Sequence, residues 1–111
     1  MASGRRGAVK PAADTDTVLT TNPASSGYIA TVNVSACNQG DSSVEVRIAL
    51  VDGTTAGDLA ATDYLEYGLD IAPSEAVERS ALVLGEGQSV VVRADTADVS
   101  FVAYGIEQTI S

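Results

Sequence analysis

The sequence predicts an all-β fold, a single antiparallel β-sandwich of the Ig-like or jelly-roll-like type with about seven short strands. Of the 111 residues, 45% are hydrophobic, and valine, which favours strands, is among the commonest of them. Segments in which every second residue is apolar recur along the chain at the spacing typical of all-β domains. No segment of useful length follows the 3.6-residue period of a helix. The length fits one compact domain with one modest core.

The first clear strands flank a cluster of turn-forming residues. Residues 28–36 place apolar side chains on one face and polar side chains on the other, and residues 44–50 alternate in the same way. Between them, residues 38–43 read Asn-Gln-Gly-Asp-Ser-Ser, which favours a chain reversal. We therefore expect a β-hairpin. The predicted apolar faces consist of Val32, Val34 and Ala36 in the first strand and Val44, Val46, Ile48 and Leu50 in the second.

A loop and a strand with two tyrosines come next. The segment Asp52–Thr62 mixes glycine with small residues and has neither period, which predicts a surface loop with at most one helical turn. Residues 63–71 return to an extended pattern that ends before Pro73. Tyr64 and Tyr67 are three residues apart, so they would point to opposite faces of a regular strand and share a face only if a bulge intervenes.

Three more strands complete the predicted domain. Residues 77–84 alternate, and Gly85-Glu-Gly-Gln88 has the length and the glycines of a tight hairpin leading into residues 90–94. Residues 99–106 form the last strand.

Charge divides the chain into a basic start and an acidic body. Arg5, Arg6 and Lys10 supply three of the six basic residues, and all fifteen acidic residues follow them. We predict an extended, flexible basic arm over residues 1–16 and a sandwich over residues 17–111. The arm is either a docking element or a flexible tail that is ordered by a neighbouring subunit or not at all. The acidic body argues against nucleic acid or an anionic membrane as partner. The chain also lacks an apolar run of the roughly 20 residues that would cross a bilayer.

The residue types exclude several kinds of chemistry. Histidine is absent, so triads built on histidine are impossible. Cys37 is the one cysteine; it cannot form an intramolecular disulfide, and at a strand end it is typical of a small buried hydrophobe. Asp52, Asp58 and Asp63 could hold calcium, although their spacing is not that of an EF-hand. We expect no enzymatic activity, no catalytic residue, no cofactor and no resident metal.

Short motifs follow one another over residues 17–107 in a consistent order. They are Val32-x-Val34-x-x-Cys37-Asn38, Val44-x-Val46-Arg47-Ile48-Ala49, Asp63-Tyr64-Leu65-Glu66-Tyr67, Pro73 with Glu78-Arg79, Leu82-Val83-Leu84-Gly85-x-Gly87 and Val99-Ser100-Phe101-x-x-Tyr104-Gly105. Their succession resembles a group of small virion structural proteins of tailed bacteriophages, which are head decoration (cement) or tail-associated β-sandwich proteins. The family's Val-Pro-Ala-Gly-type strand start is missing, because residues 20–26 are looser. The resemblance implies a non-enzymatic virion component.

Three functions follow as hypotheses. The first is a capsid decoration protein that binds the outside of the head and stabilises it through many repeated contacts. The second is a tail, neck, baseplate or fibre-attachment component. The third is a glycan- or calcium-binding receptor module, in which the tyrosines would form a sugar platform. The first two imply a homo-oligomer, trimer or dimer, assembled in the host cytoplasm, with the major capsid protein or tail proteins as partners.

For the decoration hypothesis we expect the partner interface to include the basic arm, the loop Asp52–Thr62 and the strand with the two tyrosines. The individual interface candidates are Arg5, Arg6, Lys10, Tyr64 and Tyr67.

Overall fold

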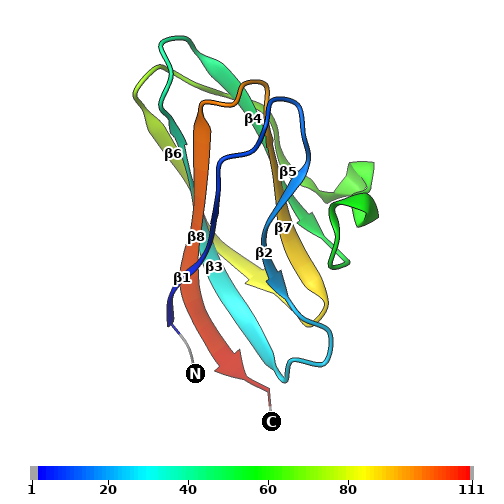
Figure 1. Cartoon of the computed structure of the whole chain (residues 1–111). Helices are drawn as coiled ribbons and strands as arrows, with labels where there is room; N and C mark the ends of the chain where they lie inside the picture. The colour runs from blue at the N-terminus through cyan, green and yellow to red at the C-terminus, as the bar shows by residue number, and fades with distance from the viewer. Residues whose placement is uncertain (1–2, 111) are drawn as a thin grey trace.

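The computed structural model describes residues 3–110 as two four-stranded antiparallel sheets that pack face to face (Figure 1). Sheet A contains β1 (Ser3–Val9), β3 (Tyr28–Asn38), β6 (Ala76–Leu84) and β8 (Val99–Thr109). Sheet B contains β2 (Thr17–Asn22), β4 (Val44–Val51), β5 (Tyr64–Ile71) and β7 (Gln88–Ala94). Two 3-10 turns, η1 (Ala56–Asp58) and η2 (Ala61–Asp63), precede β5. The predicted all-β sandwich is confirmed, with eight strands where about seven were expected.

The strand order identifies the sandwich as a jelly roll. It is β1-β8-β3-β6 in sheet A and β2-β7-β4-β5 in sheet B. The first strand pairs with the last, the second with the second to last, and so on inward. The pairs are β1 with β8, β2 with β7, β3 with β6 and β4 with β5. One long antiparallel hairpin rolled around the core produces this nested pairing, as in a double-sheet jelly roll of eight strands.

All consecutive strands except β4 and β5 therefore lie in different sheets, and two predicted hairpins are wrong. β3 lies in sheet A and β4 in sheet B, so the segment between them is an arch over the core. The connection at residues 85–87 likewise joins β6 of sheet A to β7 of sheet B. Alternation specifies which face of a strand is apolar, but not the strand with which it pairs. A local hairpin and an arch between the sheets would bury the same side chains, so the alternation does not distinguish them. The jelly-roll topology of the whole chain selects the arch.

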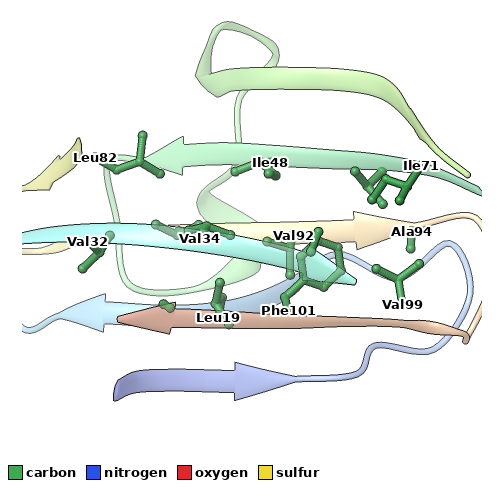
Figure 2. Close-up of a cluster of buried hydrophobic side chains, with 14 of the residues drawn as sticks. Leu19, Val32, Val34, Ile48, Ile71, Leu82, Val92, Ala94, Val99 and Phe101 are labelled. Atoms are coloured by element: carbon green, nitrogen blue, oxygen red, sulfur yellow. The ribbon is translucent and has the colours of Figure 1, made fainter. Parts of the chain in front are cut away.

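The core lies between the sheets and consists mainly of small aliphatic side chains (Figure 2). The inward faces predicted for β3 and β4 are buried, and Leu50 packs against the same cluster although it is only partly buried. Phe101 of β8, the single phenylalanine, is fully buried in the same cluster as Val92 and Ala94 of β7.

A bulge in β6 reverses the faces of that strand halfway along it. Val32 and Val34 of β3 pair with Leu82 and Arg79, so β6 has one residue more than β3 in this stretch. Ala81 takes a left-handed backbone conformation there, with φ of 60°. Val77 before the bulge and Leu82 after it are five residues apart, yet both pack on the core. The extra residue explains why the strand has no single apolar parity.

Residues 3–9 belong to the sandwich, which corrects the prediction of a flexible arm over residues 1–16. They form β1 and pair with β8 from Val9 opposite Phe101 to Ser3 opposite Ile106. Residues 1–2 of the predicted arm lie outside the described part of the chain. The long strand β8 would otherwise leave an unpaired edge. β1 covers that edge with backbone hydrogen bonds, which do not require an alternating apolar pattern.

Arg6 is held inside the molecule. Its guanidinium donates to Glu107 of β8 at 2.5 Å and lies 5.6 Å from the ring centre of Tyr28 of β3. Burial opposes the charged form, but the hydrogen bonds to Glu107 and Tyr28 outweigh it, and the pKa of Arg6 is raised. With 11% of its side chain exposed, Arg6 closes one end of the sandwich and is a poor candidate for contact with a partner.

Two fully buried asparagines join the sheets at the two ends of β3. Asn22 of β2 donates its amide hydrogens to the carbonyl oxygens of Tyr28 (2.9 Å) and Leu84 (3.1 Å), both in sheet A. Asn38, at the end of β3, donates to the carbonyl oxygens of Ser42 (2.8 Å) and Ile71 (3.0 Å), the latter in sheet B. These bonds satisfy backbone groups where strands end and regular pairing stops.

Candidate functional site

Tyr64 and Tyr67 lie on the same outer side of sheet B. In the pairing of β4 with β5, Leu65 and Gly68 are left without a partner, so β5 has an extra residue at each of these positions. Gly68 has φ of +78°, a conformation that glycine adopts without strain. The irregular register brings the two rings together with centres 4.9 Å apart and planes 80° apart. The condition for a shared face is met, but the rings meet edge to face and do not form a flat platform.

Arg47 of β4 stacks against both tyrosines. Its guanidinium carbon lies 4.2 Å from the ring centre of Tyr67 and 5.9 Å from that of Tyr64. Desolvation lowers the pKa of Arg47, but hydrogen bonding to Tyr64 and the nearby Tyr67 and Asp16 outweigh it, and the pKa is raised. Among residues 3–110, no carboxylate oxygen lies within 4.0 Å of this guanidinium. Arg47 is therefore charged and held mainly by aromatic rings.

A pocket of about 250 Å³ opens beside Tyr67 on this side of sheet B. Arg93 of β7 pairs directly with Arg47 in the sheet. It lies 3.8 Å from Asp14 and 3.6 Å from Asp16, which is ion-pair distance but beyond hydrogen-bond distance. We call this pocket the Tyr67 groove. It is lined by Asp14, Glu45, Arg47, Tyr67, Gly68, Arg93, Ala94 and Asp95.

A second, more open hollow also borders Tyr67. It has a volume of about 580 Å³ and is lined by Leu59, Ala60, Ala61, Tyr64 and Tyr67. Tyr67, 65% exposed, borders both spaces. The two hollows thus share an exposed aromatic ring as their common wall.

The loop Asp52–Thr62 packs on the outer side of sheet B. Ala56 and Leu59 cover a small cluster with Ala49, Val51 and Val91, and Figure 1 shows the two short turns beside β5. The loop therefore forms one wall of the second hollow and is itself anchored on the sheet.

Two of the three aspartates proposed as calcium ligands, Asp58 and Asp63, accept hydrogen bonds from groups of the loop itself. A carboxylate oxygen of Asp58 accepts from the backbone N–H of Thr55 (3.2 Å) and from its hydroxyl (3.0 Å), while Asp63 accepts from the N–H of Ala60 (2.8 Å). These bonds cap the two 3-10 turns. In the described part of the chain, no group of three or more histidine, cysteine, aspartate or glutamate side chains is placed to hold a metal ion.

The outer face of sheet A has a different character. Val83, Tyr104 and Ile106 are exposed there, and Ile110 follows at the end of β8. The Tyr104 hydroxyl donates to Glu78, and this hydrogen bond is the main reason why the pKa of Tyr104 is raised. Four of the five large exposed apolar residues described belong to this face or to the end of β8; only Tyr67 lies elsewhere.

The five predicted interface residues fall in three places. Arg5 is exposed and pairs with Tyr104, so it lies on the outer face of sheet A, and Lys10 is exposed just after β1. Arg6 is engaged within the chain. Tyr64 and Tyr67 are together on sheet B. Contact of any of them with a partner stays a prediction.

Sequence reasoning missed Arg47, Arg93 and Glu45 as members of a site. Glu45 and Arg47 were assigned to the polar face of their strand, and Arg93 interrupts the valine run of β7. Their convergence depends on the pairing of β4 with β7, which is non-local.

Chemically, the Tyr67 groove offers donors from arginine, acceptors from carboxylates and one aromatic face. Within residues 3–110 no helix is long and apolar enough to pass through a membrane. No protein-family model matches the chain, and no curated protein matches it in sequence.

Proposed function

We propose that this chain is a non-enzymatic structural protein of a phage virion, a decoration protein that binds the outer surface of the head and stabilises it. The observation that carries the proposal is the rolled eight-strand topology. Jelly rolls serve as capsid domains of viruses, although they also occur in lectins and cupins. Because a fold alone does not assign a function, the order of the sequence motifs, which resembles that of small virion proteins, supports the choice among these.

The outer face of sheet A is the surface that best fits contact with the major capsid protein. Val83 and Ile106 are 51% and 56% exposed and lie in one row across the sheet, each paired with Thr31 of β3. Arg5 belongs to the same face. On a protein of net charge −9, Arg5 on this face and the exposed Lys10 just after β1 are cations that would pair with acidic residues of the capsid.

A tail, neck, baseplate or fibre-attachment subunit is the alternative within the same class. Its sandwich would use the same face to join a neighbour, and in both cases assembly as a trimer or dimer in the host cytoplasm fits the proposal. The number of copies in each particle distinguishes a head protein from a tail protein.

Mass-spectrometric counting in purified particles of the virus that encodes the chain tests the proposal. We expect hundreds of copies in each particle, because decoration follows the capsid lattice. A small multiple of three or six would move the protein to the tail. Complete absence from the particles would refute a virion role.

Ile106→Asp is expected to lower the occupancy of heads at least about tenfold, because a carboxylate would be desolvated in an apolar contact. The measurement is co-sedimentation of purified protein with heads that lack it. Ser42→Asp is the matched control, because it adds the same carboxylate at an exposed position in the connection between β3 and β4, outside the row of Val83 and Ile106, and it should bind like the wild type. Equal binding of the Ile106→Asp variant and the wild type would exclude this face. Unchanged thermal melting of both variants would show that they are folded.

A further inference from the structure

We infer that the Tyr67 groove is a binding site for an uncharged saccharide. The inference does not depend on the virion proposal, because it concerns sheet B, whereas the proposed capsid contact lies on sheet A. It rests on three features of the groove: the exposed ring of Tyr67, the mixture of donors and acceptors around it, and the balance of charge among them.

The ring of Tyr67 can stack on a sugar. Tyr67 is 65% exposed, and its contacts with Tyr64 and Arg47 fix the position of its ring. A sugar ring presents C–H groups on one face, and tyrosine offers it an apolar surface with a polar tip. Because the ring is already held by its neighbours, binding costs little side-chain entropy.

The polar groups around Tyr67 match sugar hydroxyls, which both donate and accept. Arg47 and Arg93 supply donors, and both have capacity left: among residues 3–110 Arg47 has no carboxylate within 4.0 Å, and the contacts of Arg93 with Asp14 and Asp16 exceed hydrogen-bond distance. Arg47 and Arg93 are cross-strand partners, and like charges at such positions disfavour each other. A ligand that accepts hydrogen bonds from both would reduce this unfavourable interaction.

Charge balance favours a neutral ligand. Glu45, Asp14 and Asp95 supply three carboxylates against two guanidinium groups, so an acidic sugar would meet the carboxylates and a basic amine would meet the arginines. The net charge of −9 adds to the repulsion of anions. Since Tyr67 borders both the groove and the second hollow at Leu59, a chain of more than one sugar could extend from one space into the other.

An NMR titration of the full-length ¹⁵N-labelled protein tests the inference. The probes are the neutral tetrasaccharides chitotetraose, maltotetraose, cellotetraose, xylotetraose and mannotetraose, with tetramannuronate as the acidic probe. We expect at least one neutral probe to cause saturable shifts confined to amides around Tyr67, Gly68 and Arg47. Tyr67→Ala should weaken binding at least about tenfold. Tyr104→Ala, which removes an exposed tyrosine from sheet A, should leave binding unchanged.

Three outcomes would overturn the inference: no saturable shift with any neutral probe, binding of tetramannuronate alone, or binding by Tyr67→Ala within about twofold of the wild type. Folding of each variant is read from the same spectra, because a folded β-protein keeps its dispersed amide signals. A negative result here leaves the copy number in virions untouched, so failure of this inference and failure of the virion proposal are distinguishable.

Discussion

Gly105→Ala is expected to destabilise the domain by about 4 kcal/mol or more, a large share of the roughly 5–15 kcal/mol that keeps a typical domain folded. Gly105 of β8 pairs with Val32 of β3. A Cβ atom at position 105 would lie 1.9 Å from the carbonyl oxygen of Thr31 and 2.8 Å from the Cα atom of Val32. Both neighbours are backbone atoms, so no side-chain rotation relieves the overlap. β3 and β8 would have to separate in the middle of sheet A.

The measurement is urea denaturation followed by circular dichroism. Gly57→Ala is the matched control, because a Cβ atom there would meet only the Thr55 hydroxyl, at 3.7 Å, in an exposed 3-10 turn. We expect this control to change the free energy of unfolding by less than about 0.5 kcal/mol. A Gly105→Ala variant as stable as Gly57→Ala would contradict the close approach of β3 to β8.

Local pattern was sufficient to predict most strands and their buried faces. In β3, and in β4 as far as Ile48, the residues at every second position are buried as expected, because alternation depends only on the strand itself. Beyond Ile48 the pattern changes: Leu50 is only partly buried, and Ala49 is buried in the small cluster under the loop. Pairing depends on distant parts of the chain. The cluster at residues 38–43 signals a reversal equally well for a hairpin and for an arch between sheets, and the structure forms the arch.

Two other failures share this non-local cause. The segment Ser3–Val9 has the composition of a polar tail, and it becomes a strand because β8 offers it an edge. The face reversal in β6 arises from a bulge whose residue, Ala81, carries no turn signal in the sequence. The backbone N–H of Ala81 instead donates a hydrogen bond to the side-chain oxygen of Asn33 on the neighbouring strand.

The candidate site was predictable only in part. Tyr64 and Tyr67 attract attention in any chain with so few aromatic residues, and the bulge that unites them was a stated condition for a shared face. Arg47 and Arg93 are 46 positions apart in the sequence, and only the pairing of β4 with β7 brings them together. Arg6 was predicted to be a docking residue because it is a cation in a polar segment, whereas its ion pair with Glu107 depends on a residue about a hundred positions further along the chain.

Asn38→Asp is expected to destabilise the protein by about 3 to 5 kcal/mol at pH 7. The change replaces a buried NH₂ group that donates to the carbonyl oxygens of Ser42 and Ile71 with a carboxylate oxygen that repels both. The Oδ1 atom would still accept from the N–H of Gly40, so the shape and one hydrogen bond are preserved. The loss therefore reports on the donors that join the two sheets at this end of β3.

The destabilisation should depend on pH with a defined sign. Burial and the two carbonyl oxygens disfavour the ionised form, so the pKa of the new carboxyl group would be raised in the folded state above the value of about 3.9 in the unfolded chain. Above that value the unfolded state binds fewer protons than the folded state, and the free energy of unfolding of the variant falls relative to the wild type as pH rises from about 4 to 7.

Asn33→Asp is the matched control. Asn33 accepts from the N–H of Ala81 through Oδ1, which aspartate can also do, so the substitution should cost less than about 1 kcal/mol. Urea denaturation of both variants at pH 4 and pH 7 gives the comparison, and a penalty for Asn38→Asp that is equal at the two pH values would show that the buried amide hydrogens do not hold the sheets together.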